Sequence, residues 1–260
     1  MEQLAPIQLV LIGLVFVWSG FVRSGLGFGG AVLALPFLLL IHNDPLLFLP
    51  LIAVHLLIFS SWMAITNHRK VNRGRAKSDN LATIDWKYLK YALLVMIIPK
   101  LVGVFGLLTM PAKWMTSIIF VVVFVYAIGY VLNRPFKSNS KILDAVFLML
   151  GGYISGASLI GAPLIVAVFA SHVAKEQLRD TLFVLWFILV LIKVSAFALA
   201  GVDFQWLQHL WLLPLVTIGH VLGQQFHLKL VNASTGVFYR FIGSVLLLIS
   251  ILGLYKAWLV

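Results

Sequence analysis

Gly25-Leu26-Gly27-Phe28-Gly29-Gly30 interrupts a long apolar run near the start of the 260-residue chain. A second glycine-rich stretch, Gly151-Gly152-Tyr153-Ile154-Ser155-Gly156-Ala157-Ser158-Leu159-Ile160-Gly161-Ala162-Pro163, interrupts another run about half a chain later. Irregular backbone at the depth of a membrane is tolerated only where protein packs on it or a wet cavity adjoins it. A pair of glycine-interrupted segments in matching halves therefore points to the binding site of a transporter.

The composition supports a membrane protein. The chain is 62% hydrophobic and 10% charged, with a mean hydropathy of +1.06, and these values predict an all-α polytopic protein in a lipid bilayer. The absence of cysteine excludes disulfides and thiolate metal sites, and we expect no cofactor. The first residues lack the basic region of a cleavable signal peptide, so we expect the first apolar run to be retained. We attribute the net charge of +11 to basic residues that anchor the protein on the cytoplasmic side of the membrane, and not to a surface that binds nucleic acid.

Two of the apolar runs are too long for one simple helix. Six others fit one crossing of about 20 residues each. In the long runs, residues 31–41 and 163–171 would rise only about 16 Å and about 14 Å as helices, against a hydrocarbon core of about 30 Å. We therefore expect each long run to form a re-entrant hairpin, although 7–22 is long enough to cross a thin bilayer. The runs cover 7–41, 46–66, 88–108, 114–132, 142–171, 178–200, 206–228 and 237–255.

The distribution of basic residues favours the two hairpins. If both long runs return to the side they entered from, 14 basic residues face the cytoplasm and 2, Lys113 and Lys256, face outside. If every run crosses, the split becomes 11 to 5, which fits the positive-inside rule less well. The 14 residues are Arg69, Lys70, Arg73, Arg75, Lys77, Lys87, Lys90, Arg134, Lys137, Lys141, Lys175, Arg179, Lys229 and Arg240.

With two hairpins, the chain divides into two inverted repeats. Each half then holds one hairpin and three spans, and the odd number inverts the second half. We expect a first repeat over 1–132, a cytoplasmic linker over 133–141 and a second repeat over 142–260, in a single integral membrane domain. The glycines at 25 and 30 align with those at 156 and 161, and 99–103 aligns with 219–223. Inverted repeats around a site at the membrane midplane recur in secondary transporters.

The hairpin tips have the features of an anion site. Their backbone N–H groups lack helical partners, the positive end of each returning helix dipole points into the membrane, and glycine permits close approach of a ligand. Together these features describe an anion-binding site. The alternative is that the glycines only allow close packing of helices.

The buried charges have the matching sign. Arg23, Lys100 and Lys193 lie within apolar runs, whereas every Asp and Glu lies near a run end. Each such cation costs about 2.5–3.5 kcal/mol at mid-bilayer on insertion scales, so an anion from outside the chain is the expected partner. The guanidinium of Arg23 suits a planar or trigonal oxyanion. The alternatives are that Arg23 and Lys193 bond backbone carbonyls and that Lys100 extends toward the interface.

Several neutral residues complete the candidate set. His220, which aligns with Lys100, is a candidate proton carrier or a satisfied core histidine. Ser155 and Ser158 would donate hydrogen bonds to an anion or bond to their own helix.

The motifs resemble those of the TauE/SafE sulfite exporter family. The resemblance rests on Gly-Leu-Gly-Phe-Gly-Gly followed by Pro36, on the second Gly-x-Ser…Gly-Ala-Pro segment, on the paired glycine-rich third spans and on the basic loop at 67–77. It implies a bacterial inner-membrane transporter of sulfite, sulfonates or related anions, with an inverted-repeat fold and no bound cofactor. Carried over to this sequence, the resemblance also implies that the anion site is lined by Gly25, Gly27, Gly29, Gly30, Gly156, Gly161 and Pro163. Many members carry another glycine at the position of Ala162.

The sequence therefore predicts a secondary transporter that exports a small sulfur-containing oxyanion. We expect energy from a gradient, with protons as a candidate coupling ion, since no ATP-binding motif is present. An importer of organosulfonates or other small anions, a subunit of a larger export complex and an intramembrane hydrolase using Ser155 or Ser158 with a histidine are the alternatives. An oligomer is compatible with this reading, and a nucleic-acid partner is not.

Overall fold

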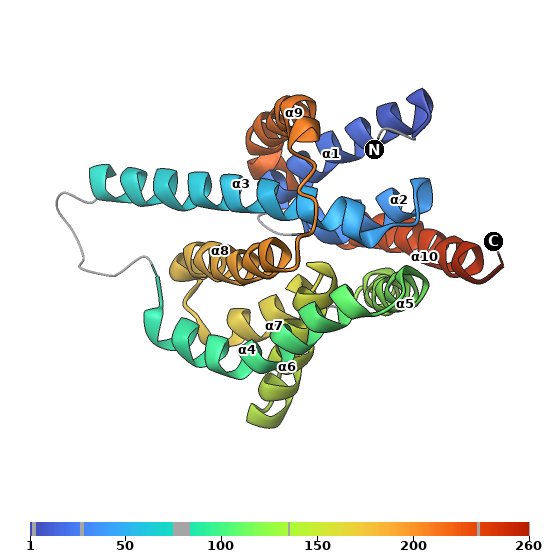
Figure 1. Cartoon of the computed structure of the whole chain (residues 1–260). Coiled ribbons are helices and arrows are strands. Elements are labelled where there is room, and N and C mark those ends of the chain that lie inside the picture. The colour runs from blue at the N-terminus through green and yellow to red at the C-terminus, as the bar shows by residue number, and fades with distance from the viewer. Residues whose placement is uncertain (2–3, 27–28, 75–83, 135, 233–234, 260) are drawn as a thin grey trace.

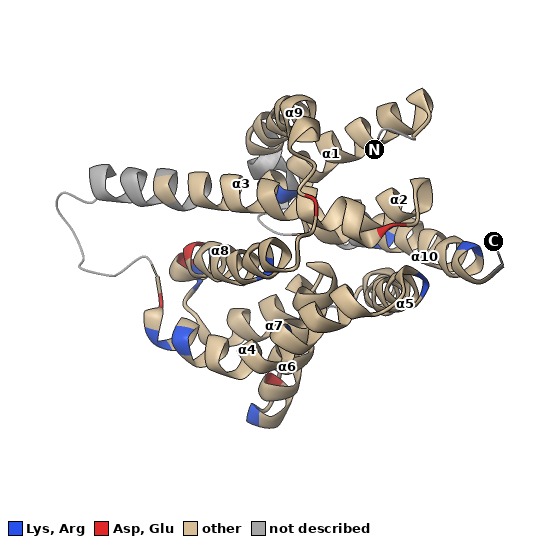
Figure 2. Ribbon diagram, in the orientation of Figure 1, with Lys and Arg blue, Asp and Glu red and all other residues tan. Residues whose placement is uncertain are grey.

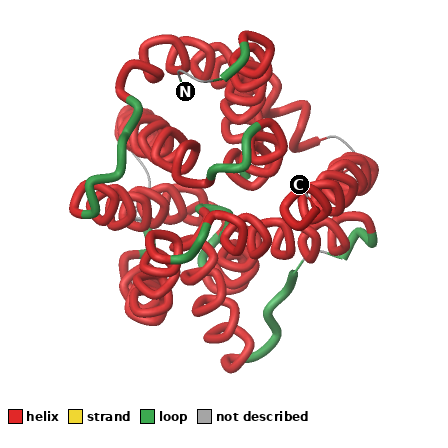
Figure 3. The backbone as a smooth tube through the Cα atoms, turned by 45° about the vertical axis from the view of Figure 1, so that its right-hand side comes forward, coloured by secondary structure: helices red, strands yellow, loops and turns green. Residues whose placement is uncertain are grey.

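The computed structural model describes residues 1, 4–26, 29–74, 84–134, 136–232 and 235–259, and these parts are helical with short connections and without strands (Figures 1 and 3). The prediction of an all-α fold is confirmed. The helices are α1 (Pro6–Leu26), α2 (Gly30–Ile41), α3 (Pro45–Gly74), α4 (Trp86–Thr109), α5 (Ala112–Val131), α6 (Lys141–Ser158), α7 (Ala162–His172), α8 (Lys175–Leu199), α9 (Trp206–Asn232) and α10 (Thr235–Leu259).

Within the described residues, six helices are long and apolar enough to span a membrane. They are α1, α3, α4, α5, α8 and α10, while α2 and α7 are apolar but shorter. The charged side chains lie mainly toward the helix ends, and most of the ribbon is uncharged (Figure 2). This arrangement is typical of a multi-pass membrane protein.

Helix α2 folds back along α1. The amide of Gln8 donates to the carbonyl of Ile41 (3.1 Å), and the hydroxyl of Ser19 donates to the carbonyl of Gly30 (3.3 Å). One residue number rises as the other falls, so the two helices are antiparallel. With 12 residues, α2 is about 18 Å long, which is shorter than a membrane span.

Helix α7 folds back along α6 in the same way. The imidazole of His172 pairs with the carboxylate of Asp144 (2.8 Å), and Gly151 faces the side chain of Ile165. The numbers again run in opposite directions. Both long apolar runs therefore form antiparallel helical pairs, and the re-entry of each pair from one side of the membrane stays a prediction.

The second break is narrower than the glycine-rich stretch suggested. Gly151, Gly152 and Gly156 lie inside α6, and only residues 159–161 separate α6 from α7. Leu159 turns the chain with a positive φ of 61°, a left-handed conformation that costs roughly 1–2 kcal/mol for a residue with a side chain. In the first half, Gly29 holds a φ of 86° before α2, at no such cost.

The glycines of α6 pack against α4. A methyl group on Gly156 would clash with the backbone of Lys100, and one on Gly152 would clash with the backbone of Met96. Gly103 lies equally close to the carbonyl of Tyr153. The residue numbers of the two helices rise together, so α4 and α6 run parallel with their backbones in contact.

The same arrangement recurs between α1 and α9. Gly219 lies against the backbone of Val17, and Gly223 lies against the backbone of Phe21. These helices are also parallel. Helices α5 and α10 are antiparallel, because Gly243 faces Tyr130 while the distant Gly253 faces Phe120. Helix α3 packs against α8.

The packing relates the two halves residue by residue. The first break follows Leu26 and ends at Gly30, and the second follows Ser158 and ends at Ala162, so equivalent residues differ by 132 in number. The glycine alignment had paired positions that differ by 131. With a difference of 132 between the hairpins, Arg23 in the first half corresponds to Ser155 in the second. The pairing of Lys100 with His220, which came from the separate alignment of 99–103 with 219–223, is unchanged.

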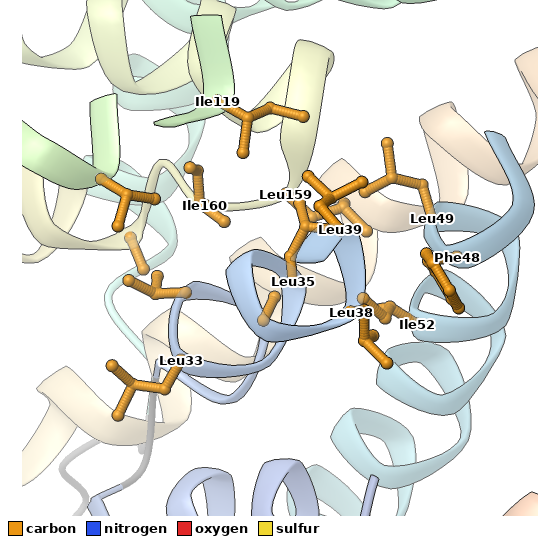
Figure 4. Packing of buried hydrophobic residues seen from close by; sticks show 14 of the residues in the cluster. Leu33, Leu35, Leu38, Leu39, Phe48, Leu49, Ile52, Ile119, Leu159 and Ile160 are labelled. Carbon is orange, nitrogen blue, oxygen red and sulfur yellow. The ribbon is translucent and has the colours of Figure 1, made fainter. Parts of the chain in front are cut away.

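Helix α2 lies at the centre of the hydrophobic core. Its residues Leu35 and Leu39 are buried, as are Leu159 and Ile160 of the second break. Figure 4 shows Leu159 beside Leu35 and Leu39. Since all four belong to one cluster, the core brings the two breaks together.

Candidate anion site

A cavity lies between the two breaks. It holds about 530 Å³ of empty space, part of which is open to solvent. Residues from both hairpins and from α3 and α8 line it, so neither half forms the cavity alone. The lining residues are Arg23, Gly29, Gly30, Ala31, Val32, Leu56, Ser60, Ser155, Leu159, Ala162, Phe183, Trp186, Leu189 and Val190.

Arg23 supplies the positive charge on the cavity wall. Its side chain is 7% exposed, and its guanidinium lies over the ring of Phe59 at 4.4 Å from the ring centroid. Its Nε and Nη2 atoms are buried and have no hydrogen-bond partner within the described residues. Buried donors of a charged group are normally paired, so the two N–H groups are candidates for contact with a ligand.

The N-termini of α2 and α7 both open at the cavity. No side chain caps either terminus, and Gly30, Ala31 and Val32 of the first turn of α2 are lining residues. The N–H groups of a first helical turn have no partner within the helix, and the helix dipole favours negative charge there. Pro163 removes one such donor from α7, so the first half contributes more donors.

Two buried lysines lie behind the wall of the cavity. The ammonium of Lys100 donates to the hydroxyl of Ser155 (3.2 Å), and the ammonium of Lys193 donates to the carbonyl of Gly156 (2.7 Å). Both lysines are 0% exposed. They stabilise the C-terminal end of α6 and do not line the cavity themselves. Because its oxygen accepts from Lys100, Ser155 keeps its own proton for a ligand.

The remaining candidates of the second hairpin have packing contacts. Ser158 donates back to the carbonyl of Ile154 (2.9 Å). Gly156 and Gly161 fit against the backbones of α4 and α6, and Pro163 is buried in the first turn of α7. None of these four lines the cavity, so a direct contact between them and an anion stays a prediction.

The first hairpin holds the other glycines. Gly29 and Gly30 line the cavity, and Gly25 is buried in the last turn of α1. Gly27 lies outside the described residues, as do the side chains of the basic loop at 67–77.

His220 does not line the cavity. Its Nδ1 is hydrogen-bonded to the hydroxyl of Ser24 and its Nε2 to the amide of Gln224 (3.0 Å). Its ring packs against the ring of Phe59, which also makes the cation–π contact with Arg23. Both ring nitrogens thus have partners within the described structure.

Sequence reasoning missed the apolar wall of the cavity. Phe183, Trp186, Leu189 and Val190 of α8 line it. Trp186 is the one with a usable signal, because it lies in the middle of an apolar run and not at an end, where tryptophan anchors a helix to the interface. The other three belong to a helix that is apolar on all sides, which gives no indication of the face that meets a ligand.

The cavity fits a small oxyanion. It combines the guanidinium of Arg23, the hydroxyls of Ser60 and Ser155 and the backbone donors of a helix terminus, and its other surfaces are apolar. Within the described residues, no group of three or more His, Asp or Glu side chains is placed to hold a metal ion. A guanidinium, hydroxyls and backbone N–H groups are the kinds of donor that bind anions.

Comparison with known proteins agrees with this geometry. The sequence model of the family described as Sulfite exporter TauE/SafE matches residues 11–253. The chain belongs to the TauE/SafE sulfite exporter family. Searches of curated proteins and of solved structures found no significant match.

Membership in the TauE/SafE family confirms the resemblance drawn from the glycine motifs. The matched residues include both hairpins, the cavity and all ten helices in whole or in part. The chain is therefore a multi-pass protein of a membrane transporter family whose description names sulfite as the exported anion.

Proposed function

We propose that this protein is a secondary transporter that exports a small sulfur-containing oxyanion, sulfite or an organosulfonate, across the bacterial inner membrane. The observation that carries the proposal is the buried guanidinium of Arg23, whose Nε and Nη2 have no hydrogen-bond partner within the described residues, at a cavity bounded by two helix breaks. Family membership supports the class of anion. An importer of the same anions would use the same site and is the alternative.

The anion binds between the hairpin tips in this proposal. Arg23 binds two of its oxygens through Nε and Nη2, in the forked geometry that suits planar or trigonal oxyanions. The N–H groups at the start of α2 and the hydroxyl of Ser155 donate to the remaining oxygen. Any organic substituent lies against the apolar side chains of α8, such as Trp186.

Transport then requires that the cavity open to each side in turn. The parallel pairs α1–α9 and α4–α6 support an inverted relation between the halves. In an inverted arrangement, the two hairpins enter the membrane from opposite sides. The first helix of each hairpin then packs against the fourth helix of the other half, as α1 does with α9 and α6 does with α4. Rocking one half against the other would expose the cavity alternately.

The membrane potential favours export of an anion. It contributes about 2.3 kcal/mol per charge for each 100 mV, with the negative side inside. No ion pair joins Arg23 to a carboxylate within the described residues, so the anion itself neutralises the buried cation. A proton carried through His220 is one candidate for further coupling.

Flux measurements in proteoliposomes test the proposal. The panel is sulfite, sulfate, thiosulfate, taurine and sulfoacetate, with acetate as the carboxylate control. We expect transport of at least one sulfur oxyanion well above acetate. Preferential transport of acetate, or no transport of any sulfur anion by protein that is folded and reconstituted, contradicts it.

Orientation decides between export and import. Proteoliposomes with one orientation of the protein, established by the accessibility of a single introduced cysteine, are given an imposed membrane potential. Export is supported if the sulfur anion moves outward, toward the face that carries Lys113 and Lys256, and faster than it moves inward under the opposite potential.

A further inference from the structure

Two buried histidines, His55 of α3 and His209 of α9, lie outside the anion cavity and form a hydrogen-bonded pair. The Nε2 of His55 and the Nδ1 of His209 are 3.2 Å apart. The two residues are 2% and 4% exposed and are separated by 154 positions in the chain. Nothing in the anion site described above uses them.

The hydrogen bonds determine where protons lie in the neutral pair. The Nε2 of His209 is 3.1 Å from the carbonyl oxygen of Phe204, and a carbonyl only accepts, so this nitrogen carries a proton. The Nδ1 of neutral His209 is then an acceptor, and the Nε2 of His55 donates to it. This leaves the lone pair of neutral His55 on its Nδ1.

The Nδ1 of His55 has no partner. It is buried and lacks a hydrogen bond within the described residues, whereas both ring nitrogens of His220 are bonded. A buried polar atom without a partner costs about 1–3 kcal/mol and calls for an explanation. A proton on this nitrogen gives the pair one positive charge, held by the hydrogen bond to His209.

The pair is electrostatically linked to the anion site. His55 directly precedes the cavity residue Leu56. It also lies about one helical turn before Phe59, whose ring is in cation–π contact with the guanidinium of Arg23. The titratable groups that interact with His55 are His209 from α9 and Arg23 from α1. Two positive charges, on Arg23 and on the pair, repel each other when the cavity is empty, and an anion between the hairpins relieves that repulsion.

One member of the pair adjoins a loop at the protein surface. His209 lies in the first turn of α9, directly after the loop that holds the exposed residues Gly201 and Asp203. His55 is hydrogen-bonded to His209 and interacts electrostatically with Arg23. The arrangement suits a proton site reached from the side opposite the basic loops.

We propose that the His55–His209 pair is a proton-binding site whose occupancy is coupled to the binding of the anion beside Arg23. The proposal rests on the proposed anion transport. By reciprocity, the anion favours protonation of the pair as strongly as protonation favours the anion. Raising the pH removes the proton and weakens anion binding, by at most about tenfold per pH unit for one coupled proton.

Calorimetric titration of the purified full-length protein tests this coupling. Sulfite and methanesulfonate are titrated in buffers of different ionisation enthalpy, which gives the number of protons taken up per anion. The readout is the difference in proton uptake per anion between the wild type and His55→Gln, measured with the same anion. Any protonation of sulfite itself cancels in that difference. His42→Gln, an exposed histidine at the end of α2, is the matched control.

We expect the wild type and His42→Gln to take up more protons per anion than His55→Gln, and the pH dependence of the affinity to flatten in that variant. His209→Gln reduces the uptake as well and carries the test if His55→Gln does not fold. Equal proton uptake in all folded variants overturns the proton site and leaves anion transport standing. Failure of both anions to bind to the wild type contradicts the proposed function itself, and the proton site with it.

Discussion

The ammonium group of Lys100 donates a hydrogen bond to the hydroxyl of Ser155, and only the serine reaches the cavity. Lys100 is fully buried on α4, and Ser155 lies in the last turn of α6. The lysine thus fixes the orientation of the serine hydroxyl, whose proton remains available to an anion. In the packing register, the corresponding position in the first half is Arg23, so the two halves of the chain present a charged group and an oriented hydroxyl to the cavity.

Ser155→Ala is expected to weaken anion binding by roughly 10- to 100-fold, since a hydrogen bond to a charged group contributes about 1.5–3 kcal/mol. The measurement is the dissociation constant of sulfite for the purified protein. Ser158→Ala is the matched control, because the hydroxyl of Ser158 bonds to its own helix at Ile154. Equal losses in both variants would remove Ser155 from the site.

The same two variants address the hydrolase alternative. A hydrolase that uses either serine as its nucleophile loses turnover completely when both are replaced. A transporter retains flux at high anion concentration, because the double replacement affects affinity. Ser155 has Lys100 as its hydrogen-bond partner in this structure, so the predicted pairing with a histidine is absent from its described contacts.

Arg23→Gln is expected to reduce anion flux by about 30-fold or more, the equivalent of the roughly 2 kcal/mol or more that a buried charged partner contributes. Removing an unpaired buried charge should at the same time leave the empty protein at least as stable to heat. The control is Arg134→Gln, an exposed arginine in the loop after α5. If Arg23→Gln unfolds the protein instead, the arginine serves the fold of the hairpin.

Two glycines of α4 provide a test of the close packing between helices. A methyl group on Gly103 would clash with the carbonyl of Tyr153, whereas one on Gly106 would lie 3.7 Å from the sulfur of Met110. Gly103→Ala is therefore expected to destabilise the protein by about 1–3 kcal/mol. Gly106→Ala should be neutral or slightly stabilising, since alanine favours helix by up to about 1 kcal/mol. Thermal unfolding in detergent compares the two, and equal midpoints would contradict the parallel packing of α4 on α6.

Much of this architecture could be predicted from the sequence. Run length and charge identified both hairpins, because a short apolar arm and the placement of basic residues are local properties of the chain. The alignment of glycines predicted a register between the two hairpins that differs by one residue from the register seen in the structure. The alignment used Gly156 and Gly161 as markers of the break. In the structure these glycines instead allow close contact with the backbones of α4 and α6, and a single sequence does not show such contacts.

The site itself was predicted only in part. Arg23, Gly29, Gly30 and Ser155 line the cavity, and charge in an apolar run was the signal for the arginine. The contribution of α8 could not be predicted, because its apolar residues surround the helix on all sides. The His55–His209 pair could not be predicted either, since the two residues come from different halves and meet only through packing of α3 beside α9.

The topology has a direct test that uses the natural absence of cysteine. Ala112→Cys places a thiol at the exposed start of α5, and Ala174→Cys places one at the exposed connection between α7 and α8. In the inverted arrangement, the first faces outside and the second faces the cytoplasm. A membrane-impermeant thiol reagent should therefore label Ala112→Cys in intact cells and Ala174→Cys only after permeabilisation. Labelling of both in intact cells would mean that α6 and α7 cross the membrane together, and the second hairpin could then not deliver the N-terminus of α7 to a cavity at the midplane.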